Sequence, residues 1–283
     1  MKKKKKLRIG SILLTFVLVC IGCVGGYMIG SKIADKYFIV DIYAGISADQ
    51  LVDDITKLGW EKKTPDKLTP AEAFQVAEFV LSETERYQII GQTDLQTSLG
   101  VSQGTISLDQ RLGEDYRFEF VTYSKFVKLA KICDYKLNGD IVIYDGTPNS
   151  AKLEDVKWSD KHDDFTWEGY KETFGKYANR NCSYYVCNAT TLKSEFIKKE
   201  GENYTFKIDL DPIKSTVCYA TQIGTNMGIN PSSIKFDTIS VTFTIDSGYH
   251  FIQQQKLEIY SLPYMGVTVG LEGNIETSFN YDC

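Results

Sequence analysis

Residues that could do chemistry are few in this 283-residue chain, and cysteine is the most prominent of them. Cys182 and Cys187 are five residues apart, so a single straight strand would point their side chains to opposite faces, and a bridge between them would need a turn. Pairing with distant cysteines is an equal alternative. The candidates for disulfides are Cys133, Cys182, Cys187, Cys218 and Cys283. Because their number is odd, at least one thiol stays free or pairs between chains.

The sequence gives little support for a metal-binding site or a hydrolytic active site. A C-x4-C pair with no second close pair is a poor match to zinc spacing, and the only histidines are His162 and His250. We predict no metal, no cofactor and no enzymatic activity. Asp209 and Asp211 flank Leu210 and could act as a carboxylate pair, although a strand end beside a helix cap is the more ordinary interpretation. One acidic cluster resembles a ligand set but is expected to be a solvated loop: Asp160, His162, Asp163 and Asp164.

The N-terminus predicts a membrane anchor. Lys2 to Lys6 and Arg8 precede Ile9–Ser31, 23 residues without a charge, which is enough to cross a bilayer as a helix. The basic flank places the N-terminus in the cytoplasm and the remainder outside. A cleaved signal peptide is disfavoured by the length and by the missing small-x-small site. Lipidation of Cys23 is a further alternative, disfavoured because the chain after it stays apolar.

Three glycines within the predicted span recur every four residues. Gly22, Gly26 and Gly30 therefore share one helix face, as in G-x-x-x-G patterns that bring two membrane helices together. This predicts a homodimer through the membrane helix, although glycine is also common in such helices for other reasons.

Charge excludes one class of partner. The first 31 residues hold six of the 32 basic residues and none of the 37 acidic ones, so residues 32–283 carry a net charge of −11. An acidic domain is a poor binder of nucleic acid. The lysine-rich start and the Lys-, Ile- and Tyr-rich composition are typical of a bacterial protein, which we expect to be a single-pass protein of the cell membrane.

The elements after the anchor begin with helices and continue as strands. Leu51, Ile55 and Leu58 share one helical face that ends at Gly59. A capping box at Thr69-Pro70-Ala71-Glu72 opens a helix over 69–83. Period-two patterns then predict strands at Tyr87–Leu95, Leu99–Leu108, Tyr116–Tyr123, Lys125–Cys133 and Ile141–Tyr144.

A polar loop over 146–164 is expected next, followed by a short helix that Thr166 caps and that stops at Gly175. Later strands are predicted at Tyr184–Val186, Leu192–Lys199 and Tyr204–Leu210. A helix then opens at Asp211-Pro212, with an apolar stripe of Ile213, Val217, Ala220, Ile223 and Met227. The cleanest alternation follows: Ile239, Val241, Phe243 and Ile245 on one face and polar residues on the other. The final strands are His250–Tyr260 and, after Pro263, Val267–Tyr281.

These elements predict an α+β fold in which the transmembrane helix precedes a large, curved antiparallel sheet, a half-barrel covered by a few helices. We expect a basic tail and anchor at 1–31, a juxtamembrane helical segment at 32–65 and an extracytoplasmic β-rich domain at 66–283.

In element order, residues 66–283 resemble the half-open β-barrel of bacterial lipoprotein carriers and their mycobacterial lipid-binding relatives. The resemblance lies in the leading helix Thr69–Glu83 before a strand meander and in a late helix before the final hairpin. It implies that the concave sheet face holds a lipid or other apolar ligand, lined by Ile239, Val241, Phe243 and Ile245, although ordinary core is the alternative for each of them. The retained anchor departs from this family, because a tethered protein cannot shuttle, so local capture or sensing is expected.

A second resemblance, at Asp209-Leu-Asp-Pro212 and the strands after it, is to uncharacterised membrane-anchored proteins of Gram-positive bacteria and implies no function. The alternative function is a protein-interaction or adhesion module that uses exposed tyrosines such as Tyr184 and Tyr185. A surface hydrolase is the least favoured.

Overall fold

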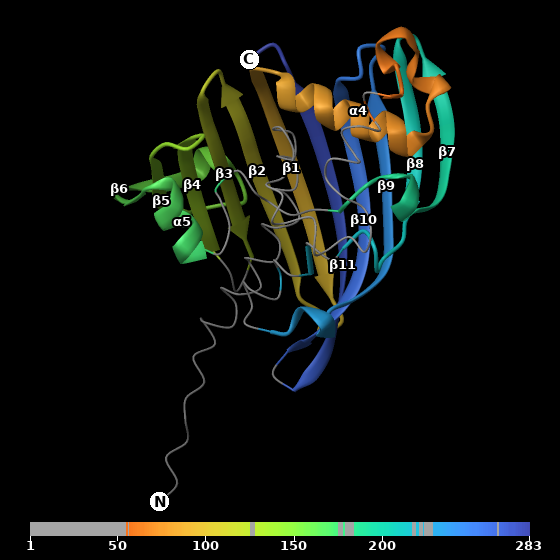
Figure 1. Cartoon of the computed structure of the whole chain (residues 1–283). Helices are drawn as coiled ribbons and strands as arrows, with labels where there is room; N and C mark the ends of the chain where they lie inside the picture. The colour runs from red at the N-terminus through yellow and green to blue at the C-terminus, as the bar shows by residue number, and fades with distance from the viewer. Residues whose placement is uncertain are drawn as a thin grey trace, which may run out of the picture.

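The computed structural model describes most of the chain after residue 54 (Figure 1). The described residues are 55, 57–124, 128–174, 178, 184–216, 219–220, 223, 229–264 and 266–283. They form one open antiparallel sheet of 11 strands with two α-helices, α4 and α5, and short 3-10 turns. The described part is therefore mostly β.

The sheet is built from two meanders joined in the middle. In the first, each strand pairs with the next along the chain: β1 (Arg86–Thr97), β2 (Ser102–Leu112), β3 (Asp115–Tyr123), β4 (Lys128–Lys136), β5 (Ile141–Pro148) and β6 (Val156–Phe165). The second comprises β7 (Thr191–Glu200), β8 (Asn203–Leu210), β9 (Lys235–Ile245), β10 (Phe251–Tyr264) and β11 (Val267–Asn280). β1 pairs with β11, from Gln88 opposite Asn280 to Thr97 opposite Leu271. The edges of the sheet are thus β6 and β7.

Both helices lie on one side of the sheet, which we call the inner face (Figure 1). α4 (Pro70–Glu83) begins at Thr69, where the predicted capping box forms: the backbone N–H of Glu72 donates to the Thr69 hydroxyl at 3.2 Å, and the N–H of Thr69 donates to the Glu72 carboxylate at 2.8 Å. The reciprocal bonds satisfy two donors that a helix start leaves open. α5 (Trp167–Phe174) covers the part of the inner face formed by β3 to β6.

The main core lies between α4 and the inner face of β1 and β8–β11. Phe74 of α4 packs edge-to-face on Phe243 and Phe251, with ring centroids 5.1 and 5.3 Å apart. Such aromatic contacts add to the stabilisation from burying apolar area. A smaller core beneath α5 contains Tyr116 and Tyr135, whose rings are stacked at 5.1 Å.

Most predicted elements are confirmed. The helix over 69–83, the short helix after Thr166 and ten of the 11 strands lie where their patterns place them, within a few residues at each end. Ile55 and Leu58 pack against the main core, and Gly59 has the left-handed backbone (φ 57°) of a helix end. The large antiparallel sheet is confirmed as well.

Four details of the predictions are wrong. Residues 146–164 are not a loop, because β6 occupies most of the second half of the segment. Residues 184–186 form no strand, Pro263 lies inside β10, and Ile213 is 78% exposed instead of facing the core. In β6 most side chains face solvent on both sides, so the apolar alternation that marks a half-buried strand is missing.

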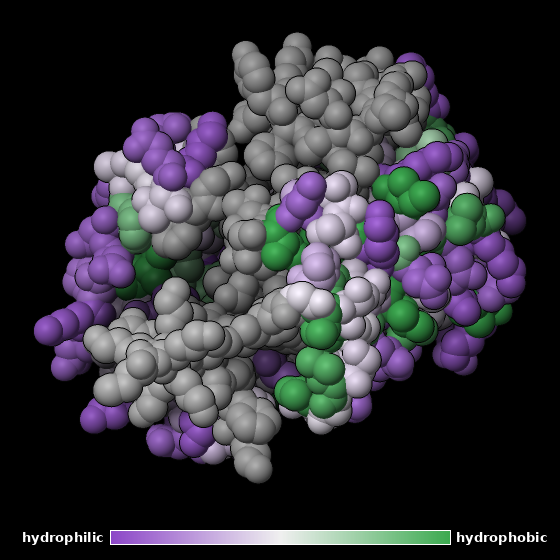
Figure 2. Space-filling view, turned by 90° about the horizontal axis from the view of Figure 1, so that it is seen from below, coloured by the Kyte–Doolittle hydropathy of each residue, from purple (hydrophilic) through white to green (hydrophobic). Residues whose placement is uncertain are grey.

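The membrane-anchor prediction lies outside the described residues, as do Gly22, Gly26, Gly30, Cys23, Cys182 and Cys218. Among the helices that the structure does describe, none has the length and hydropathy to cross a bilayer. Seen from below, the described hydrophobic residues form separate patches among hydrophilic ones (Figure 2).

Candidate functional site

The inner face of β2 is polar. Gln103, Thr105, Ser107 and Asp109 point inward and are at most 6% exposed, whereas Ile106 and Leu108 on the opposite face are only half-buried. A strand that covers a core normally has the reverse arrangement, because burying polar groups costs free energy. The centre of the inner face is therefore built for something other than apolar packing alone.

The polar residues continue across the neighbouring strands. Thr105 stands opposite Thr122 of β3, with their hydroxyls 2.9 Å apart, and opposite Thr93 of β1. Beyond Thr93 the same row passes through β11 and reaches Lys256 of β10. We call this set the polar band. Its members are Thr93, Gln103, Thr105, Ser107, Asp109, Thr122, Gln254, Lys256, Glu258 and Thr277, all of them buried.

Glycine makes room within the band. Gly273 of β11 stands opposite Glu258, and a Cβ added to Gly273 would lie 2.9 Å from Cγ of Glu258 and 3.0 Å from its Oε1. The side chain of Glu258 therefore lies over the backbone of β11. Any larger residue at 273 would displace the carboxylate.

Three charged groups gather where the band passes under α4. Glu258 accepts a hydrogen bond from the Tyr219 hydroxyl at 3.5 Å, and the ammonium of Lys256 lies 5.8 Å from the ring centre of Tyr184. Glu78 of α4 is half-buried, and desolvation raises its pKa to about 8, with the positive charge of Lys256 acting in the opposite direction. Of the three charged groups, Glu78 is the one whose pKa is raised toward neutral pH.

Asp109 is the most exceptional member of the band. It is 4% exposed, and neither of its carboxylate oxygens has a hydrogen-bond partner within the described part of the chain. Burial raises its pKa to about 7. Arg111 is the next inward residue on β2, but its guanidinium donates to the carbonyls of Ser82, Thr84 and Gly113 at 2.8 to 3.1 Å. The nearest cation on the strand is thus engaged elsewhere.

The residues predicted to line a ligand lie directly beside the band. Ile239, Val241, Phe243 and Ile245 of β9 are at most 1% exposed and belong to the main core. In the register of β9 and β10, Ile239 stands opposite Glu258 and Val241 opposite Lys256. The four side chains form an apolar flank of the polar band.

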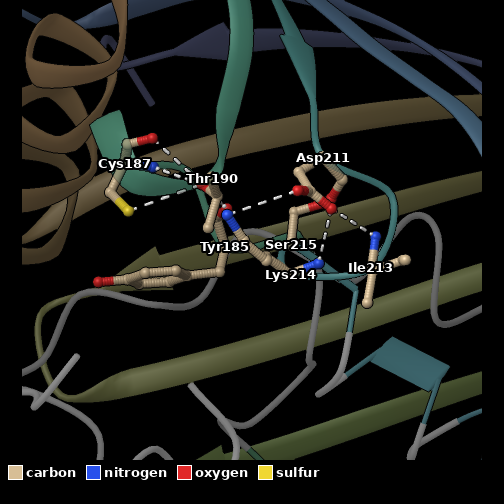
Figure 3. Close-up of polar contacts among 7 residues, drawn as sticks. All are labelled: Tyr185, Cys187, Thr190, Asp211, Ile213, Lys214 and Ser215. Carbon is tan, nitrogen blue, oxygen red and sulfur yellow. Dashed lines mark hydrogen bonds and ion pairs between the residues drawn. The ribbon is translucent and has the colours of Figure 1, made fainter. Parts of the chain in front are cut away.

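The cysteines within the described residues are far from one another in the fold. Cys187 is buried and accepts from the Thr190 hydroxyl, with the oxygen 3.6 Å from its sulfur, while the Thr190 hydroxyl also donates to the carbonyl of Tyr185 (Figure 3). Cys187 and Cys283 carry free thiols in this part of the structure, and Cys133 is half-buried beside the smaller core. Cys182, the other member of the close pair with Cys187, lies outside the described residues.

The acidic candidates have structural roles. The Asp211 carboxylate accepts from the backbone N–H groups of Ile213 and Lys214 at 2.9 and 3.0 Å, which lowers its pKa (Figure 3). Asp209 instead accepts from the Ser240 hydroxyl at 2.7 Å. Asp211 thus supports the turn after β8, where residues 212–216 form turns and bends and not the start of the predicted helix.

No metal-binding group is present among the described residues. Asp160, His162, Asp163 and Asp164 are exposed along the edge strand β6, where His162 lies 3.4 Å from the Asp164 carboxylate. Tyr184 is 5% exposed and Tyr185 half-buried, so the prediction of exposed tyrosines at these two positions is wrong.

A surface cavity of about 500 Å³ lies at the ends of β2 to β5. Its most polar feature is Arg117, which donates to both oxygens of Asp134 at 2.6 and 2.7 Å. That pairing neutralises the guanidinium, and Lys136, the other cation of the lining, pairs with Asp115 at 3.3 Å. Its lining comprises Gln110, Leu112, Asp115, Tyr116, Arg117, Asp134, Tyr135, Lys136, Asp140 and Val142.

Sequence reasoning missed Glu78, Asp109, Lys256 and Glu258. In β10 the apolar residues Leu257 and Ile259 would be expected to point inward. A register shift between Phe251 and Gln253 instead turns Lys256 and Glu258 to the inner face. The signal in the sequence that could have revealed the polar band is the alternation in β2, where every second residue from Gln103 to Asp109 is polar.

Comparisons with known proteins leave the chain without a family. No family model matches it, and no curated protein matches it. Among solved structures it is similar to a porin-like protein from Bacteroides uniformis at 7% identity and a TM-score of 0.20, over 70% of this chain and 97% of that one. A likeness this distant indicates neither a shared fold nor a shared function.

Proposed function

We propose that this chain is a binding protein that holds an amphiphilic ligand, such as a lipid, on the inner face of its open sheet. The apolar part of the ligand would contact the flank formed by Ile239, Val241, Phe243 and Ile245 once α4, which packs on this flank through Phe74, moves aside, and its polar part would reach the polar band. The observation that carries the proposal is the buried polar face of β2, beside ionisable groups on α4 and β10.

Energetics favour a ligand role for the band over a purely structural one. A buried polar group without a partner destabilises a fold by roughly 1–3 kcal/mol, and an apolar residue of the same shape would avoid that cost. Thr93 and Asp109 both carry such groups, since the Thr93 hydroxyl also has no partner among the described residues. Their presence is explained if a ligand supplies the missing hydrogen bonds.

The resemblance to half-open barrel lipoprotein carriers supports the same proposal. Those proteins hold acyl chains against the concave face of a single antiparallel sheet with helices over the opening. Here, too, a leading helix precedes the meander and lies on the inner face. With the anchor predicted from residues 9–31, we propose that the protein works tethered at the outer surface of a bacterial membrane, by local capture or sensing.

The test uses the full chain purified from its expression host. Native mass spectrometry should detect a co-purifying lipid, and after delipidation a fluorescent fatty acid should bind. Thr93→Val should weaken that binding about fivefold, the loss of one hydrogen bond, without lowering stability, because the hydroxyl has no protein partner among the described residues.

The matched control is Thr242→Val, on the outer face of β9, which should leave fatty-acid binding unchanged. Absence of both co-purifying lipid and fatty-acid uptake would overturn the proposal. Equal weakening by both variants would show that the polar band is not the binding site.

A further inference from the structure

The edge strand β7 differs from the opposite edge, β6. β7 lies at the right-hand edge of the sheet in Figure 1, and nearly all of its side chains are exposed. Apolar residues stand among them: Leu192, Phe196 and Ile197 are 67%, 45% and 46% exposed. An edge strand with exposed apolar side chains is a template on which another strand can pair.

The charges of β7 form an ordered row on the outer face. The pairing of β7 with β8 assigns Lys193, Glu195, Lys198 and Glu200 to that face, because they stand opposite the outward residues of β8. A register shift leaves Ile197 without a pairing partner on β8. Phe196 pairs with Phe206, and Lys198 pairs with the neighbouring residue Thr205. From one end to the other, the row reads positive, negative, positive, negative.

When two copies of this row lie antiparallel, each positive charge of one copy can stand opposite a negative charge of the other. If a second β7 runs antiparallel about a two-fold axis between Phe196 and Ile197, Glu195 of each copy stands opposite Lys198 of the other. Lys193 then stands opposite Glu200. Phe196 of each copy then stands opposite Ile197 of the other, so these two apolar residues lie at the centre of the contact. Opposite charges directly across two strands stabilise a pair, and like charges destabilise it.

The other edge lacks this symmetry. β6 carries Asp160, Asp163 and Asp164 against two lysines, and acids adjoin at its C-terminal end. Charged, acid-rich edges resist pairing with another strand. The contrast singles out β7.

We propose that β7 pairs with β7 of a second copy of this chain, in the antiparallel register centred between Phe196 and Ile197, and so joins two 11-stranded sheets edge to edge. The contact is isologous, as in most protein dimers. One strand pair buries less area than a standard interface of about 1,600 Å², so the dimer is weak, with a dissociation constant in the micromolar range.

The first test locates the contact. Hydrogen exchange of the full chain is measured at low and high protein concentration, and amides within 192–200 should become protected as the concentration rises. Peptides from β6 should not change. A protein that stays monomeric by sedimentation, or that dimerises without protection of β7, overturns the proposal.

The second test concerns the register. Glu195→Lys or Lys198→Glu alone creates like-charge pairs on both sides of the axis and should weaken the dimer about tenfold or more. The double variant Glu195→Lys with Lys198→Glu should restore it. Asp163→Lys on β6 is the matched control and should have no effect. If the double variant is as weak as the single ones, the proposed register is wrong.

Two controls keep the result specific. Glu195 also stands opposite Lys207 of β8, so thermal unfolding is measured for every variant to exclude a folding defect. All measurements are repeated with Gly26→Ile, which disrupts the glycine face of the predicted membrane helix. The charge reversals should act equally in both backgrounds.

Discussion

Asp109 shows how one residue can couple stability to pH. Its carboxyl group is buried without a hydrogen-bond partner among the described residues, and its pKa rises from 3.8 to about 7 on folding. A raised pKa means that the folded state prefers the protonated acid. The free energy of unfolding that Asp109 contributes is therefore greatest below about pH 4. It decreases as the pH rises from about 4 to 7 and is lowest above pH 7.

We expect Asp109→Asn to flatten this dependence. Three pKa units correspond to up to roughly 4 kcal/mol, so the wild type should be less stable at pH 8 than at pH 5, and the variant should lose less over the same interval. Urea unfolding at the two pH values measures the difference. Some slope should persist, because Glu78, with a pKa near 8, acts in the same direction.

Asp94→Asn provides the control for Asp109, since Asp94 is an exposed carboxylate on the adjacent strand β1. It should leave the pH dependence as it is in the wild type. Identical slopes for the wild type and Asp109→Asn would show that Asp109 titrates normally in the folded protein.

Residue-scale prediction from sequence succeeded for the apolar positions of β9 and failed for Ile213 and for the polar band. Ile239, Val241, Phe243 and Ile245 alternate without interruption, so their common buried face follows from strand geometry alone. Lys256 and Glu258 could not be placed, because the register shift in β10 depends on how the strand pairs with β9. The burial of Lys256 and Glu258 depends on tertiary pairing, which the local sequence pattern does not predict.

At the scale of elements, α4 depends on its first residue. The Thr69 hydroxyl accepts from the Glu72 N–H and also donates to the side-chain oxygen of Asn188 at 2.9 Å, which ties the start of the helix to the turn before β7. The cap therefore fixes both the helix and its position over the inner face.

Thr69→Ala should lower the free energy of unfolding by about 1 kcal/mol, the usual value of an N-cap side chain. Thr69→Ser keeps the hydroxyl and should lose much less. Chemical denaturation of the three proteins gives the comparison. A loss of equal size in both variants would assign the effect to the methyl group instead of the cap.

Helices and strands were predicted correctly where their residues carry a clear signal, such as a helix cap at one end or an apolar alternation on one buried face. The capping box fixed the start of α4, and alternation fixed β9. β6 was missed because an edge strand exposed on both sides has no apolar period. Residues 184–186 were wrongly assigned a strand because Tyr184 and Val186 are apolar and buried, yet they pack as part of a loop.

For the whole molecule, the pairing of β1 with β11 is the contact that makes one sheet of two meanders. Sequence supports each meander, since neighbouring strands pair by default, but no local pattern specifies this long-range pairing. A chain ending at Tyr264 lacks β11, and we expect it to lose cooperative unfolding, because β1 and β10 each lose a partner.

Thermal unfolding followed by near-ultraviolet circular dichroism tests this expectation. A chain ending at Tyr281 retains β11 and serves as the control, although it loses the hydrogen bond from Arg86 to the Cys283 carbonyl. A sharp transition in the shorter chain would mean that the two meanders fold independently.

The central place of β11 also sets the order of events during synthesis. β1 ends at Thr97 and β11 begins at Val267, so at 5–20 residues per second β1 waits roughly 10–30 s for its second partner. Throughout that interval the nascent chain exposes a long, unpaired strand edge in the middle of what will become the sheet. Factors that shield such edges at the ribosome should therefore decide how much of this protein reaches its native state.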